Sequence, residues 1–309
     1  MKFIFAGTPE FAVLPLQTLC ENGFLPVAVL TQPDRPQGRK GILTPSPVKQ
    51  FALRAGIPVL QPEKLKTDFS ALQETGATCM ITCAYGQILT KEVLSLFKKG
   101  VWNIHASLLP AYRGASPVSA AIRNEEKTTG VTIMKTDVGL DTGDILLREG
   151  IEISPRETCG SLTEKLSALG AKMILEALPA IERGDYTLIA QGEGATLTKK
   201  TVRTELDFSR PAHEVSALVR ALSPSPLAFA RAGGLILNFY DAEAVADCGG
   251  APSGTVLSAS PKTGFVVACK EGAIKITELQ PAGGKRMSAR DFLNGRKIAE
   301  GMKFDEPLL

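Results

Sequence analysis

Short apolar runs alternate with segments of helical period along the first half of the chain. Apolar runs at residues 2–7, 27–30, 77–84 and 131–134 predict strands, and residues 46–55 and 91–98 predict helices. After Gly7, Thr8 and Pro9 predict an N-cap and a first helical position. Residues 158–183 keep Leu, Met and Ile close to a 3.6-residue period and predict a long helix. Strands that alternate with helices favour a mostly parallel sheet, so we predict an α/β domain over residues 1–189.

The pattern changes in the second half of the chain. Residues 190–207 have no amphipathic period, which predicts a linker, and a short helix is expected over 212–222. Five β-like runs follow at 228–231, 235–240, 254–258, 264–269 and 273–279. Their turn-separated spacing of about ten residues is typical of a small barrel or sandwich. We predict a β-barrel domain over residues 208–309.

Composition narrows the class of protein. Of the 309 residues, 44% are apolar and 22% charged, which argues against disorder, collagen and coiled coil. The six cysteines include no C-x-x-C pair, so they predict reduced thiols rather than a disulfide framework or a zinc site. The N-terminus has neither a signal-peptide nor a transit-peptide pattern, and no apolar run suits a membrane span. We expect a cytoplasmic protein without membrane contact.

The histidines limit where acid–base chemistry can occur. Of two in the chain, His213 falls at the start of a predicted helix, where we expect it on the surface. Asn103 and His105 lie two apart on a predicted strand and therefore share one face. Ligands of open α/β sheets bind beyond the carboxyl ends of strands, which is where this pair falls. The alternative is a buried structural histidine whose hydrogen bonds an amide satisfies.

A second polar segment carries Asp137, Asp141 and Asp144 around two glycines. It lacks the order of an EF-hand loop, so a calcium site is the weaker interpretation and a plain acidic turn remains open. An aspartate beside His105 would orient the imidazole, and the Asn103 amide could donate to a developing oxyanion. Such a set can carry out acyl transfer without a covalent enzyme intermediate.

The two polar segments together resemble a family signature. N-I-H-A-S-L-L-P-A-Y-R-G-A-S-P from Asn103, followed by D-V-G-L-D-T-G-D from Asp137, is similar to 10-formyltetrahydrofolate-dependent formyltransferases. These motifs indicate the chemistry more firmly than the acceptor, since family members formylate ribonucleotide amines, sugar amines or methionyl-tRNA. F-A-G-T-P-E-F-A from Phe5, the segment 34–49 and G-K-R-M-S-A-R-D-F-L-N-G from Gly284 resemble the methionyl-tRNA branch. The likeness covers nearly the whole chain.

The resemblance implies a fold and a set of site residues. It implies a Rossmann-like first domain and an OB-like β-barrel after it, in agreement with the pattern of the elements. The catalytic residues that it implies are Asn103, His105 and Asp141, and the tetrahydrofolate-binding stretch is Ser107, Leu108, Leu109 and Pro110. It implies tRNA contact for the segment 34–49, with Arg35, Arg39, Lys40 and Lys49. The basic residues Lys199 and Lys200 in the linker could add phosphate contacts. A merely solvated loop is the alternative for residues 34–49.

The expected function follows from the resemblance. We expect transfer of the formyl group of 10-formyltetrahydrofolate to the α-amine of initiator methionyl-tRNA, by a monomer that uses no metal. One alternative is a formyltransferase for a small amine, which would need neither the basic segment nor the barrel. Another is a nucleotide-binding or RNA-binding module without activity, although no G-x-G-x-x-G follows the first strand. The net charge of +3 permits an RNA partner without requiring one.

Overall fold

The structure is a computed structural model that describes residues 1–38, 41–246, 249–295, 298–305 and 307. Its residues group into two compact units. The first comprises Met1–Pro117, Thr129–Ile151 and Thr163–Thr198. The second comprises Val118–Thr128, Glu152–Leu162 and Lys199–Leu309. The domain limits that we predicted from sequence stay a prediction.

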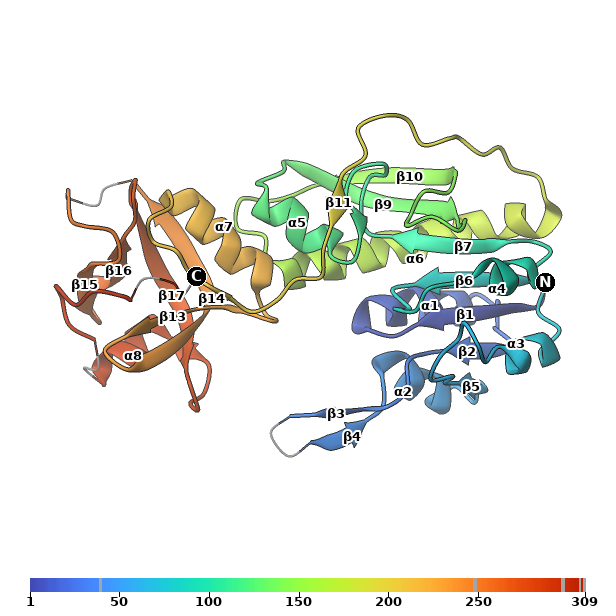
Figure 1. Ribbon diagram of the computed structural model, residues 1–309, viewed down its shortest axis with the longest axis horizontal. Helices are drawn as coiled ribbons and strands as arrows, with labels where there is room; N and C mark the ends of the chain where they lie inside the picture. Colours follow the sequence, from blue (N-terminus) through green and yellow to red (C-terminus); the bar gives the residue numbers. More distant parts are fainter. Residues whose placement is uncertain (39–40, 247–248, 296–297, 306, 308–309) are drawn as a thin grey trace. The chain divides into compact units, whose positions relative to one another are not determined.

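The first unit is built on a mixed seven-stranded sheet in the order β10-β9-β7-β6-β1-β2-β5 (Figure 1). The five strands from β7 to β5 pair in parallel, whereas β9 pairs antiparallel with β7. The α/β class with a mostly parallel sheet is therefore confirmed, with an antiparallel edge that the periodicity did not predict. The strands are β1 (Phe3–Gly7), β2 (Ala28–Leu30), β5 (Val59–Leu60), β6 (Cys79–Cys83), β7 (Val101–His105), β9 (Thr128–Lys135) and β10 (Ile145–Glu152).

Several helices between these strands begin at side-chain caps. Ser46 accepts a hydrogen bond from the Lys49 amide, 3.0 Å away, and Pro47 follows it at the first helical position. Thr90 caps its helix in the same way. The helices of this half of the chain are α1 (Val13–Glu21), α2 (Pro47–Arg54), α3 (Ser70–Glu74), α4 (Lys91–Ser95), α5 (Pro117–Arg123) and α6 (Cys159–Arg183).

The predicted helix start at Thr8 is wrong. Pro9 instead precedes a single turn of 3-10 helix, η1 (Glu10–Ala12), and α1 begins after it with Pro15 in its first turn. The Thr8 hydroxyl donates to the backbone oxygen of Tyr85, 2.8 Å away beyond the end of β6. Thr8 therefore joins two strand ends rather than capping a helix.

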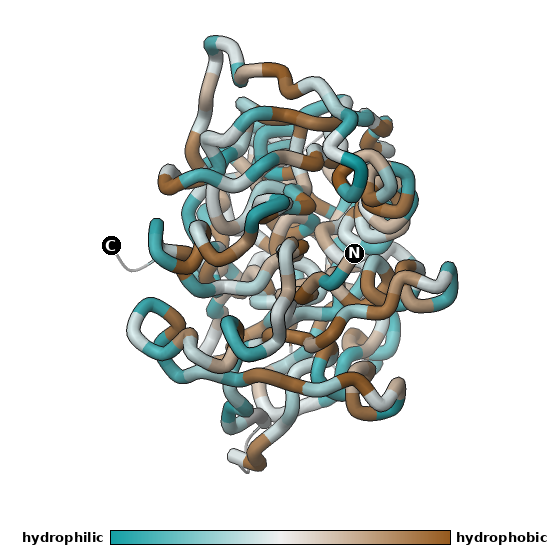
Figure 2. Tube along the Cα trace, turned by 90° about the vertical axis from the view of Figure 1, so that its right-hand side faces the viewer, coloured by the Kyte–Doolittle hydropathy of each residue, from teal (hydrophilic) through white to brown (hydrophobic). Residues whose placement is uncertain are grey.

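The central strands of the sheet are buried because their apolar side chains pack on both faces. All five residues of β1 and of β6 are buried, and the largest fully buried side chain is Trp102 on β7. Helix α6 approaches β7 closely, since a Cβ on Gly170 would lie 2.8 Å from Cγ2 of Ile104. Figure 2 shows hydrophobic and hydrophilic stretches that alternate every few residues along the trace, a pattern expected of helices and strands with one face toward the core and one toward solvent.

The second unit holds a mostly antiparallel sheet in the order β12-β13-β14-β17-β16-β15, with β18 paired to β17. This sheet confirms the barrel-type β domain expected after the α/β domain. Phe304 makes ring contacts with Phe208, Phe239 and Phe265 in its core. The elements are β12 (Thr204–Glu205), α7 (Ala212–Leu222), β13 (Ala228–Ala232), β14 (Leu235–Val245), β15 (Val256–Ser260), β16 (Gly264–Ala268), β17 (Ala273–Pro281), β18 (Met287–Ser288) and α8 (Ala289–Asn294).

Two segments predicted as irregular contain short strands. Within residues 34–49, β3 (Arg35–Gln37) pairs antiparallel with β4 (Ile42–Thr44), and α2 begins at Pro47. The linker 190–207 contains β11 (Leu197–Thr198), which pairs in parallel with β8 (Arg113–Gly114), as well as β12. A strand of two or three residues is too short to show an alternating pattern of apolar and polar positions. Its hydrogen-bond partner is set by the fold and not by its own sequence.

Within the described residues, two further features concern the state of the cysteines and the length and apolar character of the helices. Cys79, Cys83 and Cys269 are buried and form no disulfide, and burial raises the pKa of Cys79 to about 12. Cys20 and Cys159 are half-buried and also outside any disulfide, while Cys248 lies outside the described residues. Within the same described ranges, no helix has both the length and the apolar character needed to cross a membrane.

Candidate active site

The candidate site begins at the carboxyl end of β7. Asn103 and His105 lie on one face of this strand, as the spacing predicted. Strand β7 pairs in parallel with β6, and the chain leaves its end into the turn from Ala106 to Arg113. The pair therefore occupies the edge at which open α/β sheets bind ligands.

Asp141 reaches the same place from the turn that joins β9 to β10. Its backbone is left-handed, with φ of 52°, a conformation that aspartate tolerates better than most residues. Asp137 holds the start of this turn by accepting from the Thr142 hydroxyl at 2.6 Å and from the Gly139 amide at 3.0 Å. A Cβ on Gly143 would lie only 1.8 Å from the backbone oxygen of Lys135, so the end of the turn requires glycine.

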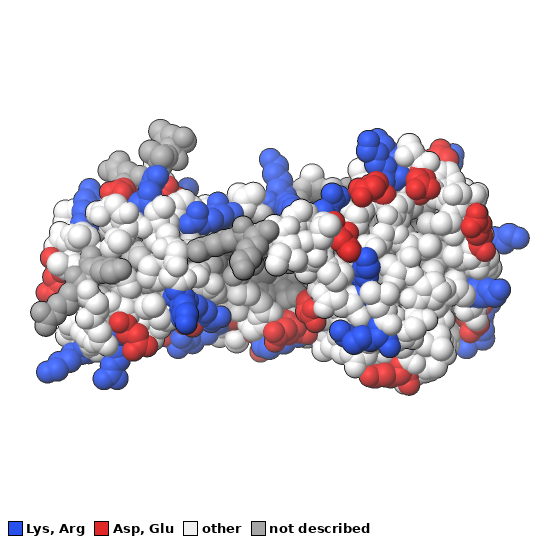
Figure 3. All heavy atoms as spheres, turned by 90° about the horizontal axis from the view of Figure 1, so that it is seen from below, with Lys and Arg blue, Asp and Glu red and all other residues white. Residues whose placement is uncertain are grey.

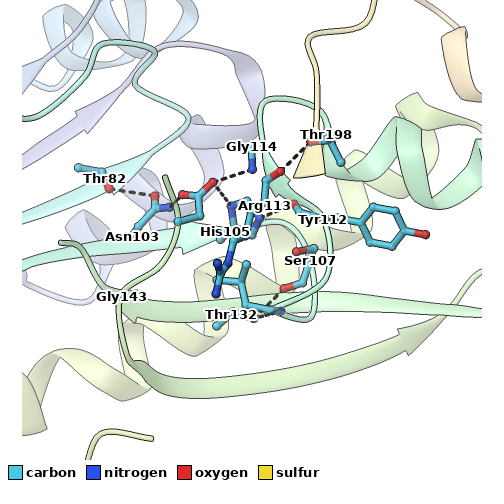
Figure 4. A network of polar contacts seen from close by, with 12 residues as sticks. Thr82, Asn103, His105, Ser107, Tyr112, Arg113, Gly114, Thr132, Gly143 and Thr198 are labelled. Carbon is cyan, nitrogen blue, oxygen red and sulfur yellow. Dashed lines mark hydrogen bonds and ion pairs between the residues drawn. The ribbon is translucent and has the colours of Figure 1, made fainter. Parts of the chain in front are cut away.

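The three predicted catalytic side chains meet in one network, of which Figure 4 labels Asn103 and His105. The Asp141 carboxylate lies 3.6 Å from Nδ1 of His105 through Oδ2 and 3.5 Å from Nδ2 of Asn103 through Oδ1. Oδ2 also accepts a shorter bond, 2.8 Å, from the backbone amide of Gly114. The backbone contact fixes the carboxylate, because the two side-chain contacts are longer than normal hydrogen bonds.

The partners of this network determine which hydrogens face the site. Nε2 of His105 lies 3.0 Å from the backbone oxygen of Tyr112, and a carbonyl can only accept. Nε2 therefore carries a hydrogen, and in the neutral ring Nδ1 keeps the lone pair on the side of Asp141. The Thr82 hydroxyl lies 2.9 Å from Oδ1 of Asn103, which places the amide NH2 toward the Asp141 carboxylate.

Burial makes these interactions stronger than they would be in water. The side chain of His105 is 6% exposed and that of Asp141 is 17% exposed. A charge or dipole in such surroundings acts through a lower effective dielectric constant. Within the described residues, no group of three or more His, Cys, Asp or Glu side chains is arranged to hold a metal ion.

The predicted folate stretch follows His105 directly. Ser107 and Leu109 are fully buried, and Thr132 binds both, accepting from the Leu109 amide at 3.1 Å and donating to the Ser107 oxygen at 2.7 Å. Leu108 and Pro110 are partly exposed. The stretch therefore offers two side chains to a ligand, while the other two hold its backbone in place.

The predicted tRNA-binding residues differ in their surroundings. Arg35 is exposed on β3, with Glu63 3.9 Å away. Lys49 lies on α2 and its Nζ donates to Asp34 at 2.8 Å, a bond that lowers the pKa of Asp34, with a further contribution from Gln61. Lys199 and Lys200 are exposed after β11, whereas Arg39 and Lys40 lie outside the described residues. On the face in Figure 3, basic and acidic side chains are interspersed.

The structure adds residues that the sequence did not single out. Gly114 has φ of 112°, and a Cβ there would lie 2.4 Å from the backbone oxygen of Thr198. Thr196 and Thr198 lie in the segment predicted as a linker, and their side chains make hydrogen bonds with the backbone of the turn after β7. Thr82 orients Asn103 from β6. A threonine that makes a hydrogen bond with a distant backbone group leaves no local pattern in the sequence. Gly114, in contrast, stands inside the motif quoted for the family.

Comparison with known proteins places this geometry in a family. The Formyl transferase model matches residues 1–178, and the Formyl transferase C-terminal domain model matches residues 199–297. The chain belongs to the formyl transferase family. The three side chains that meet at the end of β7 thus lie in the part that matches the formyl transferase model.

Several relatives in this family carry one name. The chain is 44% identical over 307 residues to the methionyl-tRNA formyltransferase of Janthinobacterium sp. (strain Marseille), covering 96% of this chain and 97% of the relative. It is 45% identical over 310 residues to that of Neisseria meningitidis, covering 98% and 100%. To that of Symbiobacterium thermophilum it is 41% identical over 313 residues, covering 99% and 96%.

Several solved structures share the fold at lower identity. WlaRD, a sugar 3N-formyl transferase crystallised with dTDP and 5-N-formyl-THF, is 20% identical with a TM-score of 0.66, over 92% of this chain and 99% of that one. The N-formyltransferase of Helicobacter canadensis is 18% identical with a TM-score of 0.67, over 93% and 100%. HypX of Aquifex aeolicus is 17% identical with a TM-score of 0.66, over 95% of this chain and 47% of that one.

Proposed function

We propose that this chain transfers the formyl group of 10-formyltetrahydrofolate to the α-amine of initiator methionyl-tRNA. The observation that carries the proposal is identity of 44–45% over nearly the full length of proteins that bear this activity as their name. The assembly of Asn103, His105 and Asp141 at one strand end gives the activity a chemical basis. Cytoplasmic location, a monomeric state and separate catalytic and barrel domains belong to the same proposal.

The reaction forms a bond from the acceptor nitrogen to the formyl carbon and breaks the bond from that carbon to the folate nitrogen. Negative charge develops on the formyl oxygen, and a proton must leave the amine and return to the folate nitrogen. The NH2 of Asn103 already faces the site, and one of its hydrogens can donate to this oxygen. A preorganised donor of this kind is worth roughly 10²–10³ in turnover.

His105 suits the proton transfer because its ring is held in one orientation. With Nε2–H donated to Tyr112, the free position is Nδ1, which takes the proton of the attacking amine. Asp141 stabilises the imidazolium that results, since its carboxylate lies 3.6 Å from Nδ1. The proton then passes from Nδ1 to the leaving nitrogen, so the enzyme returns to its starting state.

The predicted folate stretch supports donor binding beside these groups. Leu108 and Pro110 are the members of the stretch that keep exposed surface, and the stretch begins two residues after His105. A pterin ring that packs on them therefore lies within reach of the trio. We propose no metal and no covalent enzyme intermediate for this reaction.

A formyl-transfer assay with two acceptors tests the proposal. We expect purified full-length protein with 10-formyltetrahydrofolate to formylate methionyl-tRNA and to leave free dTDP-amino sugars unmodified. Sugar-amine formylation with no product on methionyl-tRNA would replace the proposal with the small-amine alternative. Folate or RNA binding with neither product would favour a binding module without activity.

A further inference from the structure

Gln191 makes four hydrogen bonds with its side-chain amide in the first unit. Its Nε2 donates to the backbone oxygen of Asp141 at 2.8 Å and to that of Gly143 at 2.7 Å. Its Oε1 accepts from Nε of Arg113 at 3.0 Å and from Nη2 at 2.8 Å. Both hydrogens and both lone pairs of the amide are therefore used.

The chemistry of the partners fixes which way this amide points. Arg113 can only donate and the two backbone carbonyls can only accept, so exchanging Oε1 and Nε2 would break every one of these bonds. The two bonds from Arg113 are charge-assisted and converge on Oε1, so together with the two bonds from Nε2 they hold the amide at both of its ends. Gln191 therefore acts as a fixed clamp on the turn that carries Asp141.

The chain around Gln191 is fastened to the same region at both ends. Ile189 exchanges two backbone hydrogen bonds with Ile145 at the start of β10, at 2.8 Å and 2.9 Å. Thr196 accepts from the Tyr112 amide at 2.7 Å, and β11 pairs with β8. We call residues 189–198 the strap, because the segment binds the Asp141 turn and the turn after β7 together.

We propose that Gln191 is a positioning residue of the formyl transfer, which sets Asp141 against His105 through the backbone of the Asp141 turn. Asp141 needs such support, because its left-handed backbone is disfavoured and its own side-chain contacts to His105 and Asn103 are long. Gln191 holds the turn at the backbone oxygen of Asp141 itself and at that of Gly143, two residues later. The expected effect on kcat rests on the proposed function, whereas the hold of Gln191 on the Asp141 turn rests on the hydrogen-bond geometry alone.

Kinetics of Gln191→Ala and Gln191→Glu in the full chain test the proposal. Glutamate keeps the two lone pairs that Arg113 needs and loses the two donors, so we expect both variants to lose kcat with KM for either substrate little changed. A loss up to on the order of 10²-fold corresponds to misplacement of a catalytic group by about 1 Å. Wild-type turnover in Gln191→Glu would overturn the proposal, because the bond to Arg113 would then be the one that matters.

A double-mutant cycle separates positioning from general stability. If Gln191 acts through Asp141, Gln191→Ala should have little further effect on kcat once Asp141→Asn is present. Multiplying effects in the double variant would overturn the proposal. Thr75→Ala is the control, since it removes two side-chain hydrogen bonds of the first unit at a position before the amino end of β6. It should lower Tm as Gln191→Ala does and leave kcat unchanged.

Hydrogen exchange gives a readout that does not depend on activity. The Gly114 amide donates to Asp141, so loosening of the Asp141 turn should speed exchange of that amide in Gln191→Ala and not in Thr75→Ala. Faster exchange in a protein that formylates no methionyl-tRNA would keep the clamp and reject the proposed function. Unchanged exchange would reject the clamp whatever the activity.

Discussion

At the scale of single residues, the site combines side chains that a sequence can reveal with backbone contacts that it cannot. Asn103 and His105 were predictable because they share one face of a strand that ends at a ligand-binding edge, whereas Asp141 was singled out among three aspartates by the resemblance to the family signature. Gln191 was not, because its partners are carbonyls of Asp141 and Gly143, and any residue has a carbonyl. The roles assigned to the three side chains stay predictions that kinetics can test.

Removal of the catalytic groups should affect chemistry more than binding. We expect His105→Ala and Asp141→Asn each to lower kcat by orders of magnitude with donor affinity nearly unchanged, because both are assigned to proton transfer. Asn103→Ala should lose about 2.7–4 kcal/mol of transition-state stabilisation as an oxyanion donor. Steady-state kinetics measure kcat and the loss of transition-state stabilisation, and folate titration measures donor affinity. Near-normal turnover of the His105 variant would exclude it as the base.

Gly114→Ala should damage both stability and turnover. The added Cβ would meet the Thr198 oxygen, so β8 and β11 must separate and the amide that holds Asp141 must shift. Gly184→Ala is the control, since Gly184 also has positive φ but nothing lies within 4 Å of its Cβ position. The control should cost roughly 1–2 kcal/mol of unfolding free energy and no activity. Equal losses in denaturant unfolding and equal kcat would contradict a steric role for Gly114.

At the scale of elements, hydrophobic periodicity predicted the long helices and missed most of the strands of two or three residues. The limits of α7 and the long helix α6 follow from repeating apolar positions and from stop signals, which act locally. The pair of β3 and β4 and the pair of β8 and β11 escaped because they contain two or three residues each. The pairing of β8 with β11 also joins residues 84 positions apart, Arg113 with Leu197 and Gly114 with Thr198.

A pH-dependent contact joins α7 to the turn after α5 in the second unit. Nδ1 of His213 lies 2.6 Å from Glu125, and this hydrogen bond raises the pKa of His213 above its ordinary value. A raised folded-state pKa means that the pair stabilises fully below about pH 6.5 and that the stabilisation disappears as pH rises through the raised value. The predicted surface position of His213 is confirmed, since its side chain is 59% exposed.

Thermal unfolding across pH tests this contact. We expect the Tm difference between wild type and His213→Gln to be positive at about pH 5.5 and to vanish by about pH 9. Glu125→Gln removes the same ion pair from the other side and should give the same pH profile. A Tm difference that is constant over the range would show that packing rather than charge is involved.

At the scale of the whole molecule, charge is balanced rather than concentrated. The net charge is +3, and residues 190–309 contain 15 Lys and Arg against 13 Asp and Glu. A tRNA partner would therefore depend on a local group of basic residues and not on the overall field. Lys199 and Lys200 suit this role, because both are exposed where the strap ends.

Loss of these two lysines should weaken tRNA binding in a salt-dependent way. For Lys199→Ala with Lys200→Ala we expect weaker binding and a salt slope lower by roughly 1–2, at about 0.7–0.9 per phosphate contact. Folate affinity should not change. Lys91→Ala with Lys98→Ala removes the same charge from exposed positions around α4 and serves as the control. Filter binding over a salt series decides, and identical slopes for both pairs would exclude a specific phosphate contact.

The distance along the chain between the strap and the residues it holds has a consequence for biosynthesis. Gln191 follows Asp141 by 50 residues, and Thr196 follows Tyr112 by 84. Because a nascent chain leaves the ribosome from its N-terminus, all three predicted catalytic residues emerge well before the segment that is proposed to fix them. We therefore expect the newly made polypeptide to gain formyl-transfer activity only once residues 189–198 have been translated and docked.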